Sequence, residues 1–158
     1  MEKKIEKKLS KLWGKVGFIV QLSQMVEYNL ANILSFDEIL IEFETRNSMY
    51  VLEHNDLVKR ADDLYSKLSI SPLGKVIARA EQVKFFTDEG IELLREACTQ
   101  RNYVVHDLFK DDLILKHIET NPDFYFKRLE ATIDLLYKIN EVLTDIFKKQ
   151  KEEYKLIY

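Results

Sequence analysis

The chain has 158 residues, 46% hydrophobic and 11% aromatic, which is long and apolar enough for one domain with a sizeable core. A net charge of −3 argues against a broadly basic surface that binds any nucleic acid, although a local anion-binding cleft is compatible with it. Only four glycines and two prolines are present, and no alternating run of β-branched residues indicates a strand. We therefore expect an all-α protein in which residues 1–158 form a single domain.

The compartment is indicated by what the sequence lacks. A single cysteine, Cys98, excludes an intramolecular disulfide and a multi-cysteine metal site, and it fits a reducing cytosol. The first residues contain no continuous apolar segment, and no stretch approaches the roughly 20 apolar residues of a membrane span. We therefore expect a soluble cytoplasmic protein without membrane contact.

The first half of the chain predicts two helices. Apolar residues spaced by threes and fours from Ile5 to Ile33 predict a long helix that ends near Leu34. The run Ser35-Phe36-Asp37-Glu38 matches a capping box, so a second helix is expected to start there and to extend to Leu68. The polar residues 44–48 and the pair His54-Asn55 are expected to bend or split this second helix.

Three helices follow in the second half. Pro72, with Ser71 as its cap, predicts a short helix over residues 72–85. Thr87 and two acidic residues after it predict the start of a helix over residues 88–109. The run Asn121-Pro122-Asp123 predicts the start of a long last helix. Long first and last helices around shorter inner segments indicate a four-helix bundle with short additional helices.

The helix expected over residues 88–109 carries an arginine within its apolar face. On a helical wheel, Arg101 falls near the middle of a stripe formed by Ile91, Leu93, Leu94, Ala97, Cys98, Val104, Val105 and Leu108. An unpaired guanidinium in a dry core costs several kcal/mol, so Arg101 requires an acidic partner, a wet cleft or a ligand. Asn102 and His106, four residues apart, share one edge of this stripe. The three polar residues define a candidate site.

Several chemistries have no sequence motif to support them. The chain contains no glycine-rich phosphate loop and no Glu-x-x-His pair of the kind that holds two irons in helical bundles. It also lacks a Gly-x-Ser-x-Gly elbow, and Cys98 lies eight residues before His106 on a different part of the helix. We therefore expect no metal, no cofactor and no covalent nucleophile, which leaves the arginine and the histidine.

The segment Arg101-Asn102-Tyr103-Val104-Val105-His106 resembles the HEPN superfamily. The mark of this family is an arginine, four to six intervening residues and a histidine, often with a polar residue directly after the arginine. The resemblance implies a dimeric four-helix bundle that acts as a metal-independent endoribonuclease of toxin or defence type, with RNA as substrate and a cognate antitoxin or regulatory protein as partner. Leu108 stands where some HEPN toxins have a tyrosine that a partner nucleotidyltransferase modifies, so the resemblance does not extend to that route of silencing.

The residue types suit RNA cleavage without a metal. The 2′-hydroxyl of RNA can attack the adjacent phosphorus if one group moves protons and another stabilises the added negative charge. An imidazole such as that of His106 serves as acid or base near neutral pH, and the guanidinium of Arg101 matches two phosphate oxygens. Asn102 is able to orient the histidine or to bind a phosphate oxygen. A two-fold dimer would bring two copies of this small site together.

Other readings remain open. In the first, Arg101 pairs with an acid of a neighbouring helix, such as Glu27 or Glu81, and forms a structural polar layer. In the second, the same cleft belongs to a non-catalytic helical module that binds RNA, a nucleotide or a partner protein. In the third, the chain is a structural or regulatory dimer with its first helix as the interaction surface.

Overall fold

The computed structural model describes residues 2–45, 54–110 and 114–157, and all regular elements in these ranges are helical. The α-helices are α1 (Glu2–Thr45), α2 (His54–Ser69), α3 (Leu73–Ala80), α4 (Asp88–Asn102), α5 (Ile114–Thr120) and α6 (Pro122–Ile157). A π-helical segment, η1 (Tyr103–Asp107), follows α4 directly. The all-α class is confirmed, as is the plan of long first and last helices with short additional ones.

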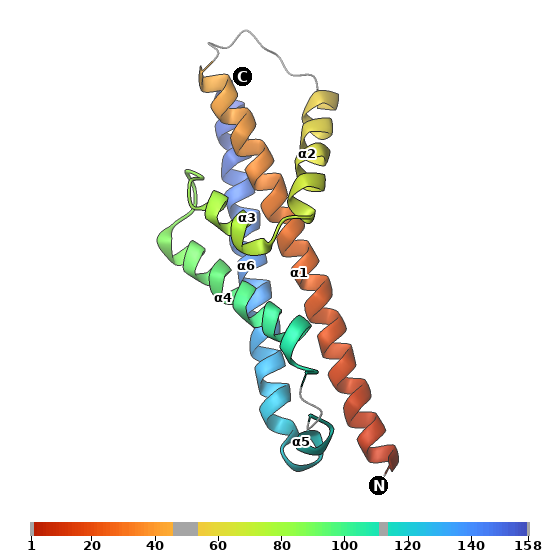
Figure 1. Ribbon diagram of the computed structural model, residues 1–158. Coiled ribbons are helices and arrows are strands. Elements are labelled where there is room, and N and C mark those ends of the chain that lie inside the picture. The colour runs from red at the N-terminus through yellow and green to blue at the C-terminus, as the bar shows by residue number, and fades with distance from the viewer. Residues whose placement is uncertain (1, 46–53, 111–113, 158) are drawn as a thin grey trace.

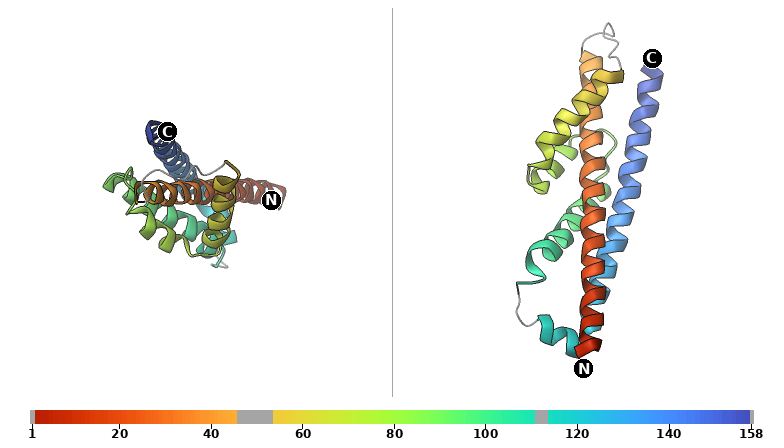
Figure 2. Two further views of the ribbon diagram at one scale, coloured as in Figure 1. Left: turned by 90° about the horizontal axis from the view of Figure 1, so that it is seen from above. Right: turned by 90° about the vertical axis from the view of Figure 1, so that its right-hand side faces the viewer.

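The two long helices run parallel, because α1 and α6 both start at the same end of the molecule (Figure 1). The helices α2 and α3 lie along the other side of α1 from α6, as the side view shows (Figure 2). Helix α4 packs mainly against α6, from Gly90 beside Val142 in its first turn to Gln100, which accepts from Arg128 Nε. The π-helical segment after α4 contacts α1, and its residues Val105, His106 and Asp107 are exposed.

Aliphatic side chains from every α-helix form one core. Its largest fully buried members are Leu12, Ile19, Leu30, Ile33, Leu94, Ile118, Leu129, Leu136, Ile139, Leu143, Val104 and the polar Gln150. The α1–α6 contact also contains amides, since Asn29 Nδ2 donates to Asn140 Oδ1 at 3.0 Å and Gln150 Nε2 donates to the Ile33 carbonyl at 3.0 Å. Buried amides of this kind disfavour other alignments of the two helices, because sliding would leave them without partners.

The predicted helix start at Ser35 is wrong. Helix α1 continues through this residue to Thr45, and the buried Ser35 hydroxyl donates to the Arg60 carbonyl of α2 at 3.5 Å. The physical reason is that the apolar spacing does not stop at Leu34, since Ile39 and Leu40 are buried as well. Burial of that continuing face outweighs the local capping signal, which is worth only about 1 kcal/mol. The predicted split of the second helix falls partly on residues 46–53, which lie outside the described ranges.

The inner helix boundaries agree with the sequence only in part. Pro72 precedes α3, but Ser71 does not cap it; the Ser71 hydroxyl donates backwards to the Lys67 carbonyl at 3.0 Å. Helix α3 ends at Ala80 and turns follow it, so the predicted end at Phe85 is wrong. The cap at Thr87 is confirmed, since its hydroxyl accepts from the Gly90 N–H at 3.1 Å. The start of the last helix at Pro122 is also confirmed.

Within the described ranges, no helix combines the length and the apolar character that crossing a membrane requires.

Candidate functional site

Arg101 lies in the last turn of α4 and reaches across to α1. Its Nη2 is 3.2 Å from Glu27 Oε1, and its Nη1 donates to Asn102 Oδ1 at 3.0 Å. The Nε atom is buried and has no hydrogen-bond partner among the described residues. An unpartnered buried donor costs roughly 1–3 kcal/mol.

The acidic partner of Arg101 is Glu27 and not Glu81, which instead pairs with Arg95. The side chains of Glu27 and Arg101 are 32% and 26% exposed, respectively. Solvent therefore reaches both members of the pair and screens their attraction. The pairing predicted by the structural reading is present, yet the guanidinium is not sealed in a dry core.

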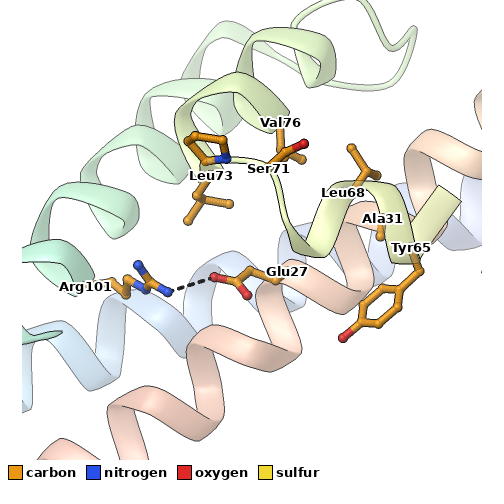
Figure 3. Close-up of a pocket in the computed structure, with 9 residues that line it drawn as sticks. Glu27, Ala31, Tyr65, Leu68, Ser71, Leu73, Val76 and Arg101 are labelled. Carbon is orange, nitrogen blue, oxygen red and sulfur yellow. Dashed lines mark hydrogen bonds and ion pairs between the residues drawn. The ribbon is translucent and has the colours of Figure 1, made fainter.

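A cavity of about 160 Å³ opens beside this ion pair. Figure 3 shows the Arg101 and Glu27 side chains directed toward each other at one end, with Tyr65 at the other. The remaining lining comes from α1, α2, α3 and the turn between α2 and α3, through Ala31, Leu68, Ser71, Pro72, Leu73 and Val76. The site thus offers a charged pair beside a mainly apolar hollow, a combination that suits a ligand with both a polar and a flat apolar part.

Asn102 is held by its neighbours in the same helix. Its Oδ1 accepts from Arg101, and its Nδ2 lies 3.7 Å from Cys98 Sγ, a weak donor–acceptor contact. Among the described contacts, none joins Asn102 to His106, so the predicted role of Asn102 in orienting the histidine has no direct contact behind it. Burial raises the pKa of the Cys98 thiol, although Arg101 and Asn102 act in the opposite direction. A thiol held in its protonated form is a poor nucleophile.

His106 lies in η1 and its side chain is exposed. It does not line the Arg101 cavity, and no described hydrogen bond or ion pair connects the two residues. A 2.7 Å hydrogen bond from the Lys110 ammonium lowers the pKa of the exposed carboxyl of its neighbour Asp107. The structure therefore brings Arg101 and Asn102 together and presents His106 separately, at the surface of the adjoining turn.

The π-helical turn itself was not predicted. Its i→i+5 geometry is evident in the Leu108 N–H, which donates to the Tyr103 carbonyl at 2.9 Å. Single π-turns within α-helices occur frequently at functional sites. Here the turn coincides with the segment between the candidate arginine and histidine, which is an observation independent of the motif. Apolar periodicity offered no signal for it, since helix type at one turn depends on tertiary packing.

A second cation, Arg128, also lies beside the motif. Its guanidinium carbon lies 3.3 Å from the centroid of the Tyr103 ring, and its Nε donates to Gln100 Oε1 at 3.3 Å. This stacking fixes the end of α4 against α6. Arg128 was not predicted from the sequence, because its relation to Tyr103 depends on the packing of two segments that are remote in sequence. In the described ranges, no three His, Cys, Asp or Glu side chains gather as metal ligands would.

Comparison of the chain with models of protein families, with curated proteins and with solved structures gives no significant match.

Proposed function

We propose that the protein is a metal-independent endoribonuclease of toxin or defence type, with Arg101, Asn102 and His106 as its catalytic residues. The observation that carries the proposal is the position of the partly exposed Arg101 guanidinium on the wall of an open cavity. A guanidinium in that position is available to a phosphate, whereas a purely structural ion pair does not need the cavity. The HEPN resemblance of the motif agrees with this role.

The proposed reaction is transesterification within the RNA. The ribose 2′-oxygen forms a bond to the adjacent phosphorus while a histidine takes the 2′-hydroxyl proton. The bond between phosphorus and the 5′-oxygen then breaks, and that oxygen receives a proton from an imidazolium. Arg101 donates to the non-bridging oxygens, on which negative charge accumulates in the transition state. The products are a 2′,3′-cyclic phosphate and a 5′-hydroxyl, so atoms and protons balance without a metal or an oxidant.

A second copy of the chain would complete this site. Arg101 and His106 share no described contact in one chain, and the reaction requires one group that takes a proton and one that gives it. In a two-fold dimer, the arginine of one copy would face the histidine of the other in each of two equivalent sites, and the one imidazole of each site would take the proton as base and, as imidazolium, give it to the leaving oxygen. The proposed partners are therefore RNA, a second copy of the chain, and a cognate antitoxin or regulatory protein.

The test is an RNA digest with excess chelator and analysis of the product ends. We expect cleavage that leaves cyclic phosphates, its loss in His106→Ala, and full activity in His117→Ala. The second variant is a matched control because His117 is also exposed and helical, but contacts Tyr125 at 3.1 Å in another part of the molecule. Intact RNA with the wild-type protein, or equal activity of both variants, would contradict the proposal.

The pairing of Arg101 with Glu27 favours a second candidate function, a helical module that binds RNA or a nucleotide without cleaving it. The carboxylate partly neutralises the guanidinium, which weakens its attraction for a phosphate. Binding of RNA by the wild-type protein without any product in the same digest would support this alternative.

A further inference from the structure

The cavity between Glu27, Tyr65 and Arg101 has the size and lining of a pocket for one flat ring. Its volume is about 160 Å³, and a closed apolar cavity of about 150 Å³ holds benzene. This cavity is not closed, because Tyr65 and Pro72 on its lining are exposed, so a larger ring system can extend from it. Nucleobases taken out of a stack bind in such pockets, between aromatic or apolar side chains and polar groups that read the base edge.

The polar groups of the cavity are an acceptor and a donor side by side. Glu27 Oε1 accepts from Arg101, and Glu27 Oε2 has no described partner. A carboxylate has about four acceptor positions and a guanidinium has five N–H donors, so both retain capacity for a ligand. Only Glu27 and Arg101 carry charge among the lining residues. The base edge that fits them must combine donors for the carboxylate with an acceptor for the guanidinium.

Guanine is the standard base with that edge. Its N1–H and N2–H donors are adjacent and match the two oxygens of one carboxylate, and its O6 acceptor lies next to them. Adenine and cytosine place an acceptor beside their donor, and uracil has a single donor between two acceptors. We infer that the cavity binds an unpaired guanine of the RNA substrate, with Glu27 as its specificity-determining residue. The inference rests on the proposed function and specifies the substrate of that site.

A positioning role for Glu27 would give a different result. If Glu27 only orients the Arg101 guanidinium, its replacement changes the binding of every RNA by the same factor. If it reads guanine, replacement by glutamine weakens the binding of guanine-containing RNA selectively, because an amide accepts at one atom only. The ratio of the affinity for guanine-containing RNA to the affinity for the other RNAs therefore distinguishes the two roles, whereas the absolute affinity does not.

The experiment measures the affinity of the His106→Ala protein for five short single-stranded RNAs. They are identical except at one central position, which is guanine, inosine, adenine, cytosine or uracil. We expect guanine to bind about fivefold tighter or more than adenine, cytosine and uracil, since a good bidentate contact discriminates by roughly 1–3 kcal/mol. The affinity for the inosine RNA, which lacks the N2 amino group, should lie between that for the guanine RNA and those for the other RNAs.

Three further variants in the same background complete the test. Glu27→Gln should abolish the preference for guanine, and Glu81→Gln, a matched change at a glutamate paired with Arg95 outside the cavity, should preserve it. Tyr65→Ala should weaken the binding of all five RNAs, because an aromatic ring stacks on any base. Equal affinity for all bases, no measurable binding of any RNA, or a uniform loss in Glu27→Gln would overturn the inference. Melting temperatures verify that each variant is folded.

Cleavage of RNA by the wild-type protein in the presence of chelator tests the proposed function separately. Cleavage without a base preference overturns the guanine pocket and leaves the ribonuclease proposal intact. A guanine preference without cleavage overturns the ribonuclease proposal and leaves the guanine pocket intact.

Discussion

The Glu27 carboxylate and the Arg101 guanidinium, 74 residues apart in the chain, meet at 3.2 Å at the edge of an open cavity. Both side chains are partly exposed, so their attraction is screened by solvent. Their contact ties the end of α4 to the middle of α1 while leaving part of the guanidinium's donor capacity unused. The contribution of this contact to the free energy of unfolding decides whether Arg101 is mainly structural or mainly functional.

Arg101→Ala is expected to change the free energy of unfolding by about 1 kcal/mol or less, because partly exposed ion pairs contribute little. Removing one member of a sealed pair would instead cost about 3–5 kcal/mol. Chemical denaturation of the wild type, Arg101→Ala, Glu27→Gln and the double variant measures the coupling directly. A coupling energy above about 3 kcal/mol would favour the structural reading. Arg101→Lys should not restore cleavage, since an ammonium lacks the planar fork.

His106→Ala should abolish RNA cleavage and leave the melting temperature nearly unchanged, because an exposed imidazole makes little packing contribution. Initial rates and thermal melts on the same preparation check both parts. Asn102→Ala should reduce activity less, since it removes one hydrogen bond to Arg101 and leaves both proposed catalytic groups in place. Greater loss in Asn102→Ala than in His106→Ala would contradict the assigned roles.

Mixing two inactive variants tests the composite dimer. If Arg101 of one copy acts with His106 of the other, a dimer of Arg101→Ala with His106→Ala contains one intact site. After equilibration of an equal mixture, about a quarter of the wild-type activity should return, because half the dimers are mixed and each has one of two sites. A mixture that remains inactive, or a protein that light scattering shows to be monomeric at micromolar concentration, would contradict the composite site.

Asp37 on α1 predicts a measurable pH dependence of stability. Burial, followed by repulsion from Glu38, Glu153 and Glu44, raises the pKa of Asp37. The folded state therefore binds this proton more tightly than the unfolded state, so stability falls as pH rises from the unfolded pKa through the raised folded one. Asp37→Asn should stabilise the protein at pH 7, by about 0.5 kcal/mol after screening, and this gain should disappear below pH 4. Urea unfolding at both pH values provides the check; a constant gain would contradict the assignment.

The helical class and most of the long-range plan follow from spacing, because apolar periods of 3.6 residues over many turns leave few alternatives. Helix ends were less predictable. Ser35 has the chemistry of a cap but is buried against α2, and tertiary burial decided its role. Thr87, which is exposed just before α4, caps that helix as expected.

The candidate site was predictable in its principal residue and not in its surroundings. An arginine on an apolar stripe requires a partner or a cleft, and Arg101 has both. The sequence leaves Glu27 and Glu81 as equivalent partners for Arg101, because it does not give the rotation of α1 relative to α4. The stacking of Arg128 on Tyr103 has no local signal, since it depends on the register of α6.

The π-turn at Tyr103–Asp107 changes what the number of residues between Arg101 and His106 means. In an uninterrupted α-helix, residues five apart point about 140° away from each other. A π-turn contains more residues per revolution and brings such a pair closer to alignment. One helical revolution can thus absorb an inserted residue without rotating the arginine and histidine apart. Spacers of different length between an arginine and a histidine are then compatible with a similar direction of the two side chains, and counting residues alone underestimates how alike two such segments are in space.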